Sequence, residues 1–307
     1  MKAPKSQPLP PRRAATPRIS GPTRSRDRSR TNGEQVEGVR AVYELINSNR
    51  RKVEQVLVDE RFEFERANSL IQEIIHTCGK RKTNLRFVGS QELSGLSQTA
   101  NCQGLLAFAE PIEILSLGEL VELSGPTPEL SGPTPELSGP TPRNGGDIGT
   151  LNTPPFYVLL DGVTDPQNFG AIARSALAFG ASAIITAKNR SVQLTPSAMK
   201  AAAGALERLP ISIVPGIAGA LEVLKRNNIW TIGLCPDGDE PLDKVSLLSE
   251  PLGIVLGSEG SGISRLVRSR CDVVASILQT GQIGSLNVSA AAAVALYEVY
   301  KSRVANT

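Results

Sequence analysis

The chain has 307 residues, of which 40% are apolar, and a formal net charge of +3. This length is enough for two domains, and no run of about 18 apolar residues is present to predict a membrane-spanning helix. The N-terminus lacks the apolar segment of a secretory signal. Four widely spaced cysteines without a CxxC pair argue against a zinc site and a disulfide framework. We therefore expect a protein of the reducing cytoplasm, with no metal and no membrane attachment.

Positive charge is concentrated in residues 1–31, which contain nine Lys or Arg residues and a single acidic residue, Asp27. Large apolar residues are almost absent from this tail, so we predict that it is disordered. A basic tail can attract nucleic-acid phosphates without sequence preference, or can simply be a solvated extension. A transit peptide is a third interpretation, because the segment is rich in Arg and Ser and poor in acids.

Residues 32–112 alternate between helical and strand patterns, which is typical of a small α/β domain. We expect helices at 37–49 and 60–80, the second ending near Gly79, and strands at 53–59, 84–88 and 103–110. The basic side chains of this segment either form a surface that faces phosphate groups or are only solvated; they are Arg40, Arg50, Arg51, Lys52 and Lys80 to Lys82.

Residues 113–154 are expected to form a linker between two domains. The sequence SGPTP occurs three times, beginning at Ser124, Ser131 and Ser138. Two prolines in each unit exclude regular helix and sheet, so this stretch predicts a semi-extended spacer. We interpret the repeats as a neutral expansion.

Residues 155–307 alternate regularly between apolar strand patterns and helical patterns. This alternation predicts a parallel sheet with helices on both faces. The expected strands are 156–161, 182–187, 210–214, 229–234, 252–257 and 272–277, and Thr195 followed by Pro196 predicts the start of a helix over Ser197–Leu206. Ligands of such sheets bind beyond the carboxyl ends of the strands.

Three polar, glycine-bearing loops follow strands at 159–180, 253–264 and 277–300, so we expect them to meet at one site. GSEGSG at 257–262 is not followed by the Lys of a phosphate loop, and the dinucleotide signature GxGxxG is absent. The only histidine, His76, lies in a predicted helix near Lys80 to Lys82 and outside these loops, which argues against a His–Asp mechanism. The loops suit a polar, phosphate-bearing substrate and a positioned hydroxyl; their polar residues are Asn168, Arg174, Glu259, Ser285 and Asn287.

These loops resemble the three motifs of the SpoU, or TrmH-type, RNA ribose 2′-O-methyltransferases of the SPOUT superfamily. The first motif corresponds to DPQNFGAIARSALAFG, the second to IVLGSEGSGIS and the third to ILQTGQIGSLNVSAAAAVALYE. The segment 34–110 resembles, more loosely, the L30e-like substrate-binding domain of the members that modify rRNA. GVRAVYELI and CQGLLAFAE are its recognisable ends.

The resemblance implies an α/β fold. A C-terminal parallel-sheet SPOUT domain with a deep trefoil knot, residues 155–307, would follow a small L30e-like α/β substrate-binding domain, residues 32–112. It also implies S-adenosylmethionine as methyl donor, a homodimer through the C-terminal domain, and structured RNA as substrate. A guanosine of 23S rRNA is favoured over a tRNA.

By position, the resemblance places the cofactor against Gly257, Ile277 and Leu286, and it adds Leu234 and Gln279 to the cofactor-binding residues. It assigns catalysis and substrate positioning to Arg174, Asn168, Glu259, Ser285 and Asn287. A guanidinium normally only donates hydrogen bonds. We therefore expect Arg174 to bind the adjacent phosphate and stabilise the developing alkoxide, which leaves the base open. Taken alone, Glu259 is also compatible with a loop cap, and Ser285 and Asn287 with helix caps.

The sequence departs from the family pattern at three places. The third motif usually begins Ile-Pro-Met, whereas this chain has Ile277, Leu278 and Gln279. In the N-terminal domain, Arg40 stands where a histidine is common, and Cys102 stands where another histidine often precedes Gln-Gly. A non-catalytic RNA-binding or ribosome-assembly protein of the same fold is therefore the alternative function, favoured only by Leu278 and Gln279.

Overall fold

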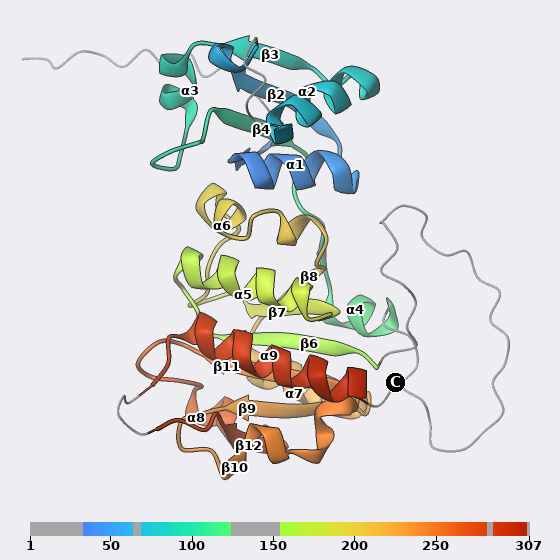
Figure 1. Cartoon of the computed structure of the whole chain (residues 1–307). Helices are drawn as coiled ribbons and strands as arrows, with labels where there is room; N and C mark the ends of the chain where they lie inside the picture. The colour runs from blue at the N-terminus through green and yellow to red at the C-terminus, as the bar shows by residue number, and fades with distance from the viewer. Residues whose placement is uncertain (1–32, 64–68, 124–153, 281–284, 306–307) are drawn as a thin grey trace, which may run out of the picture. The chain divides into compact units, whose positions relative to one another are not determined.

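Two β-sheets organise the chain over the residues that the computed structural model describes, 33–63, 69–123, 154–280 and 285–305 (Figure 1). All of these residues belong to one compact unit, residues 32–307. The predictions for the basic tail, the SGPTP repeats, and Gly281 and Gly284 lie outside the described residues.

The first sheet has four strands in the order β1-β4-β2-β3, with β2 and β3 parallel and the other pairs antiparallel. Helix α1 forms because apolar residues recur on one face, where Val42, Leu45 and Ile46 are fully buried. The elements are β1 Glu34–Glu37, α1 Val39–Ser48, β2 Val53–Asp59, α2 Ser69–Arg81, β3 Leu85–Val88, α3 Ser90–Leu96 and β4 Leu105–Ala109.

The predicted small α/β domain is confirmed in its main elements, namely α1, β2, β3 and β4. Three details differ from the prediction. Strand β1 and helix α3 were not expected, and the helix predicted over 60–80 is α2, which begins only at Ser69, after a 3₁₀ turn at Glu60–Phe62, and continues past Gly79 to Arg81. Strand β1 has the sequence EQVE, in which buried Gln35 and Glu37 give no apolar alternation to detect.

The second sheet has eight strands in the order β10-β12-β9-β11-β6-β7-β8-β5, and every neighbouring pair is parallel. Its strands are β5 Ile114–Leu115, β6 Phe156–Asp161, β7 Ala183–Ala187, β8 Ile211–Val214, β9 Trp230–Leu234, β10 Glu240–Pro241, β11 Leu252–Gly257 and β12 Val273–Ser276. Its helices are α4 Leu117–Leu123, α5 Pro166–Ala178, α6 Pro196–Ala201, α7 Ile217–Arg226, α8 Arg265–Arg268 and α9 Val288–Ala305.

Helices cover both faces of this sheet, as predicted. Strand β6 shows why: Phe156, Val158 and Leu160 join the apolar cluster that contains α5 and α9, while Tyr157 and Leu159 join the cluster that contains α7. In Figure 1, α9 crosses in front of β6 and β11, and α5 lies beside it. A strand buried on both faces has no polar side, which explains its continuous apolar sequence.

The helix predicted over Ser197–Leu206 ends earlier than expected. Thr195 caps α6 as predicted, accepting a hydrogen bond from the Ala198 N–H at 3.4 Å. The helix stops at Ala201 because Ala203 and Gly204 have φ angles of 49° and 89°, in the left-handed region. A Cβ atom on Gly204 would lie 2.3 Å from Cβ of Glu44, so only glycine allows α1 to approach this closely.

Residues 114–123, which the sequence placed inside the linker, belong to the second sheet and its helices. Strand β5 pairs in parallel with β8, and α4 packs beside β8 and α7. Leu120 of α4 is 2% exposed and joins the same apolar cluster as α7. The spacer predicted from 113 therefore starts after Leu123 at the earliest.

A buried ion cluster joins the two sheets. The Arg51 guanidinium donates to both carboxylate oxygens of Glu207, at 2.6 Å and 3.0 Å, and also pairs with Glu34. The Arg51 and Glu207 side chains are only 6% and 1% exposed. Arg50 donates to the carbonyl oxygen of Arg208 at 2.8 Å. Arg50 and Arg51 therefore do not belong to the predicted phosphate-facing surface, because both bind other residues of this protein.

The close packing of α5 on α6 generates a prediction about Gly170. A Cβ atom at Gly170 would lie 2.4 Å from Cβ of Ala201 and 2.5 Å from its carbonyl carbon. We expect Gly170→Ala to lower the free energy of unfolding by about 1–3 kcal/mol, because the two helices must move apart. Urea denaturation followed by circular dichroism measures this change.

Gly219 is the matched control, since it lies inside α7 and a Cβ atom there would meet nothing within 4 Å. Gly219→Ala should leave stability unchanged or raise it by roughly 0.5–1 kcal/mol through helix propensity. Equal effects of the two substitutions would show that α5 and α6 do not approach closely at Gly170.

Candidate active site

The three polar loops meet at one edge of the eight-stranded sheet, as the sequence predicts. Strands β6 and β11 are parallel neighbours, with Asp161 opposite Gly257, so the chain leaves both at the same edge. Strand β12 runs parallel to β9 and leads towards the loop before α9. The loops that precede α5, follow β11 and precede α9 therefore converge.

Asn168, Glu259 and Asn287 form a hydrogen-bonded network that joins the three loops. The Asn168 Nδ2 donates to Glu259 Oε1 at 3.1 Å, and the Asn287 Nδ2 donates to Asn168 Oδ1 at 3.0 Å. The Asn287 Nδ2 also makes a short contact to Glu259 Oε1. Both hydrogen bonds to Glu259 use Oε1, which leaves its Oε2 without a partner among the described residues.

The start of α5 positions Asn168. Asp165 caps the helix by accepting a hydrogen bond from the Asn168 N–H at 2.9 Å, and Pro166 takes the first helical position, where no N–H is needed. This fixes the backbone at Asn168, a residue that is only 8% exposed. A buried amide must have partners, and the network provides them.

Asn287 caps α9 and joins the network at the same time. Its Oδ1 accepts from the Ser289 N–H at 2.9 Å and from the Ser289 hydroxyl at 2.6 Å, while its Nδ2 faces Asn168 and Glu259. The helix-cap interpretation is therefore correct for Asn287 but incomplete. No hydrogen bond of Ser285 is found within the described part of the chain, and its side chain is exposed.

The loop after β11 folds back onto the end of its own strand. Ser258 and Gly262 exchange two backbone hydrogen bonds, at 3.0 Å and 2.9 Å, and Gly260 and Gly262 have positive φ angles. A Cβ atom on Gly257 would lie 2.0 Å from the carbonyl carbon of Gly262. The glycines therefore make a tight hairpin that leaves Glu259 at its exposed tip.

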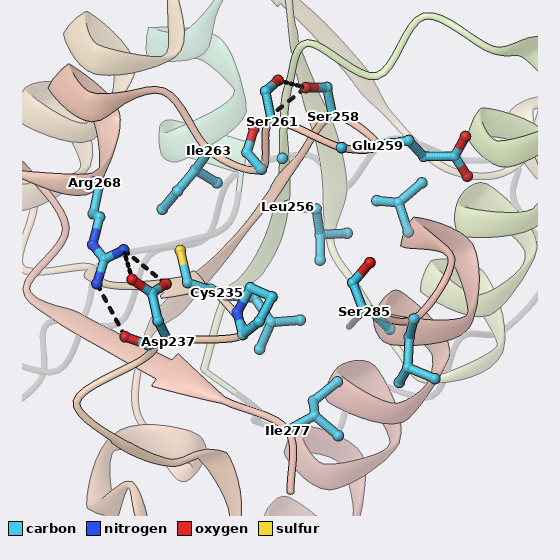
Figure 2. Close-up of a pocket in the computed structure, with 18 of the residues that line it drawn as sticks. Cys235, Asp237, Leu256, Ser258, Glu259, Ser261, Ile263, Arg268, Ile277 and Ser285 are labelled. Carbon is cyan, nitrogen blue, oxygen red and sulfur yellow. Dashed lines mark hydrogen bonds and ion pairs between the residues drawn. The ribbon is translucent and has the colours of Figure 1, made fainter. Parts of the chain in front are cut away.

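A cavity of about 340 Å³ lies beside this network (Figure 2). Ser285 and Glu259 line it on one side in Figure 2, and Asp237 with Arg268 on the other. All five residues that the sequence assigned to cofactor binding line it, namely Leu234, Gly257, Ile277, Gln279 and Leu286. Its volume is within the range of small-molecule sites, roughly 300–1,000 Å³.

The sequence analysis missed a fourth loop of this cavity, which follows β9. Cys235, Pro236 and Asp237 line the wall, and Arg268 binds both Asp237 carboxylate oxygens at 2.8 Å. The signal was present, because CPDG at 235–238 is another polar, glycine-bearing loop at the carboxyl end of a strand. Burial raises the pKa of the Cys235 thiol, so this group stays protonated at neutral pH and is a poor nucleophile.

Arg174 does not line this cavity. It lies on the exposed side of α5 and lines a second cavity of about 590 Å³, together with Arg40 and Lys200. Neither a hydrogen bond nor an ion pair holds Arg174 within the described residues. The structure thus places Glu259 and Ser285 in the lining of one cavity, with Asn168 and Asn287 hydrogen-bonded to Glu259 beside it, and places Arg174 in the lining of a second cavity.

Metal-binding clusters and membrane-spanning helices are both absent from the described ranges. They contain no group of three or more His, Cys, Asp or Glu residues arranged to hold a metal ion. None of their helices combines the length and apolar character needed to cross a membrane.

Comparison with known proteins assigns the family. The model of the SpoU rRNA methylase family matches residues 155–297, and the model named RNA 2′-O ribose methyltransferase substrate binding matches residues 35–115. The first match covers just under half of the chain, and a relative that is 32% identical over 99% of its own length extends the likeness to almost the whole chain, which therefore belongs to the SpoU rRNA methylase family.

Individual relatives agree with this assignment. An uncharacterised tRNA/rRNA methyltransferase of Synechocystis is 34% identical over 229 residues, which are 75% of this chain and 53% of that protein. The chain thus matches about half the length of that relative. The 23S rRNA (guanosine-2′-O-)-methyltransferase RlmB of Escherichia coli K12 is 32% identical over 88% of this chain and 99% of that protein.

Solved structures show the same fold. The SpoU methyltransferase AviRb of Streptomyces viridochromogenes, in complex with AdoMet, superposes with a TM-score of 0.65 and 23% identity. The superposition covers 88% of this chain and 90% of that one. The predicted α/β architecture, with a parallel-sheet domain after a substrate-binding domain, is confirmed.

The network generates a prediction for Asn168→Asp. The new carboxylate cannot donate to Glu259 and adds a like charge beside it. We expect the free energy of unfolding at pH 7 to fall by about 1–3 kcal/mol, since a buried donor is lost. Methyl transfer should fall by at least roughly tenfold, the factor that corresponds to about 1.4 kcal/mol.

Asn228→Asp is the control, because Asn228 is exposed in the turn before β9. Chemical denaturation and a methyl-transfer assay on both variants measure the difference. If the two variants are equally stable and equally active, the network does not hold the three loops together.

Proposed function

We propose that this protein methylates a ribose 2′-hydroxyl in structured RNA, with S-adenosylmethionine as the methyl donor. One observation carries the proposal. A single cavity at the carboxyl ends of the parallel strands lies directly beside the network of Asn168, Glu259 and Asn287. Membership of the SpoU rRNA methylase family supports the same chemistry.

The residues of the cavity suit this cofactor. Leu234, Ile277 and Leu286 supply apolar surface for an adenine ring, and the bare backbone of Gly257 allows a ligand to approach closely. The carboxylate of Glu259 also lines the cavity and favours a positively charged ligand, whereas the charge of Asp237 is balanced by Arg268. S-adenosylmethionine supplies a methyl group already activated on a sulfonium.

The remaining task of the protein is placement of the 2′-hydroxyl and stabilisation of its oxygen as the proton leaves. Glu259 Oε2 has no partner within the described residues, so it is available to accept a hydrogen bond from the hydroxyl. Ser285 lines the cavity beside it and can contact the same ribose. Orientation of this kind contributes several kcal/mol to lowering a barrier, by order of magnitude.

Arg174 would bind the phosphate next to the reacting ribose. Its guanidinium is exposed and has no partner within the described residues, so it is free to contact RNA. It would stabilise the negative charge that develops as the proton of the 2′-hydroxyl leaves. Asn168 and Asn287 hold Glu259 in place and are in this sense positioning residues.

The proposed substrate is a guanosine of 23S rRNA. A relative that is covered almost completely is named a 23S rRNA guanosine-2′-O-methyltransferase, and the N-terminal match is to an RNA substrate-binding domain. Gln279, which replaces the usual Met, lines the cavity, whereas Leu278 is 68% exposed and outside it. The replacement therefore leaves the cavity open, which favours an enzyme over a non-catalytic RNA-binding protein.

We further propose a cytoplasmic homodimer formed through the C-terminal domain, with a deep knot in that domain. The dimer is supported by an apolar stripe on α9, where Val294, Tyr297, Tyr300 and Val304 are between 41% and 55% exposed. Phe179 packs against both tyrosines. A row of exposed apolar side chains along one helix is typical of an interface between chains.

Calorimetric titration with S-adenosylmethionine, followed by transfer of labelled methyl to RNA, tests the proposed function. We expect binding at micromolar strength with one site per chain, and loss of binding in Gln279→Arg, whose longer charged side chain enters the cavity. Arg174→Ala should keep cofactor binding and stability but lose methyl transfer.

Arg226→Ala is the control for Arg174→Ala, because Arg226 is exposed at the end of α7. If the wild-type protein does not bind S-adenosylmethionine, the non-catalytic alternative is correct. Turnover of Arg174→Ala close to that of wild type would exclude the role given to Arg174.

The dimer has a separate test. Tyr297→Glu places a charge in the centre of the α9 stripe, so we expect the molar mass from light scattering to fall from two chains to one. Glu298→Gln, on the same helix turn, should remain dimeric. A monomeric wild-type protein would contradict the proposed dimer.

A further inference from the structure

The second cavity, of about 590 Å³, is lined by positive side chains from three helices. Arg40 comes from α1, Arg174 from α5 and Lys200 from α6. The loop formed by residues 97–103, hereafter the 97–103 loop, contributes Gln98, Thr99 and Gln103 to the rest of the lining. The cavity therefore brings cations of the first sheet's domain and of the second sheet's domain to one place.

Glu37 is the only acidic residue that lines the cavity, and its carboxylate is not accessible to a ligand. Its carboxylate is fully buried and accepts hydrogen bonds from the side chains of Gln35, Ser97 and Thr99 and from the Gln98 and Thr99 N–H groups. Although burial opposes the charge, these donors hold the pKa of Glu37 below its usual value. The charge of Glu37 thus fixes the 97–103 loop, and the cavity presents a positive surface.

The three cations have unused hydrogen-bond donors. The Lys200 ammonium donates to Thr99 Oγ1 at 3.4 Å and to the carbonyl oxygen of Asn101, which uses two of its three N–H groups. Arg40 and Arg174 are exposed, and within the described residues neither makes a hydrogen bond or an ion pair. Each guanidinium has a planar set of donors that matches a phosphate.

The cavity adjoins the network of the candidate active site. Gln167 lines the cavity, and the next residue of α5, Asn168, donates to Glu259. None of the residues that line the cavity is aromatic, so no stacking platform for a base is present. A polar wall with three cations is instead suited to sugar and phosphate groups.

We propose that this cavity binds the phosphodiester backbone of the nucleotide adjacent to the methylated one, through Arg40 and Lys200 together with Arg174. This inference rests on the proposed function, and it assigns to Arg40 and Lys200 the substrate contacts that set the register of the RNA. Lys200 also ties the 97–103 loop to α6, so the ligand binds where the two domains are already joined.

Salt dependence of RNA binding tests the phosphate contact. We would measure fluorescence anisotropy of a fluorescein-labelled transcript of a 23S rRNA fragment over a series of KCl concentrations. Relative to wild type, Arg40→Ala should bind roughly tenfold more weakly and show a log–log salt slope smaller by about 1, the change for one lost phosphate contact. Arg226→Ala is the control and should keep the wild-type slope.

Two readouts separate this effect from a damaged fold. Arg40→Ala should bind S-adenosylmethionine with wild-type affinity, and its KM for RNA should rise while kcat stays close to wild type. A salt slope equal to that of Arg226→Ala would overturn the proposal.

A modified RNA tests which phosphate is bound. After the methylated nucleotide is mapped, we would replace each adjacent phosphate by a neutral methylphosphonate. Wild type should lose affinity for one of these RNAs, whereas Arg40→Ala should lose nothing further from the same replacement. Equal losses in both proteins would overturn the proposed position. If wild type transfers no methyl group to RNA, the proposed function fails, while the salt slopes still report on the cavity.

Discussion

The hydrogen bonds between Asn168, Glu259 and Asn287 hold together three loops that are far apart in the sequence. Asn168 and Asn287 are 119 residues apart, and their side-chain contact is possible because parallel strands release the chain at the same edge of the sheet. Each loop is itself fixed by local chemistry: Asp165 caps α5, Asn287 caps α9, and Gly257 allows the β11 hairpin to close. The cavity beside the network depends on all three.

The relation between the two sheets depends on a different kind of contact. Arg51 and Glu207 are nearly fully buried, and Gly204 permits α1 to lie directly on the chain after α6. A buried ion pair is costly to desolvate and is maintained only where its hydrogen bonds are satisfied, as they are here by Glu34 and the Glu110 carbonyl oxygen. These contacts fix one wall of the second cavity against the other.

Much of the fold was predictable because its signals are local. The strands of the second sheet are continuous apolar runs, and Thr195 with Pro196 marks the start of α6. The end of α6 was not predictable, since it depends on Glu44 packing against Gly204 across 160 residues of sequence. Strand β5 and helix α4 were missed for a similar reason: they are too short to show a period, and Leu120 is buried by elements distant in the sequence, β8 and α7.

The candidate site was likewise predictable in part. The position of each motif after a strand indicated that Asn168, Glu259 and Asn287 would meet, and they do. The sequence did not indicate that Arg174 would lie at a neighbouring cavity, because the face of α5 that is exposed is decided by packing on α6 and α9. Arg50 and Arg51 show the converse error, in which a basic cluster resembled a ligand surface but is used internally.

The ion cluster also restricts how relatives of this protein can be recombined. Arg51 and Glu44 belong to the N-terminal domain, while their partners Glu207 and Arg208 follow α6 in the C-terminal domain. A chimera that takes its N-terminal domain from another family member would leave Glu207 buried without a counter-charge unless the donor also supplies an arginine at the position of Arg51. The N-terminal domain can therefore be exchanged only together with the charged residues that pair with the C-terminal domain.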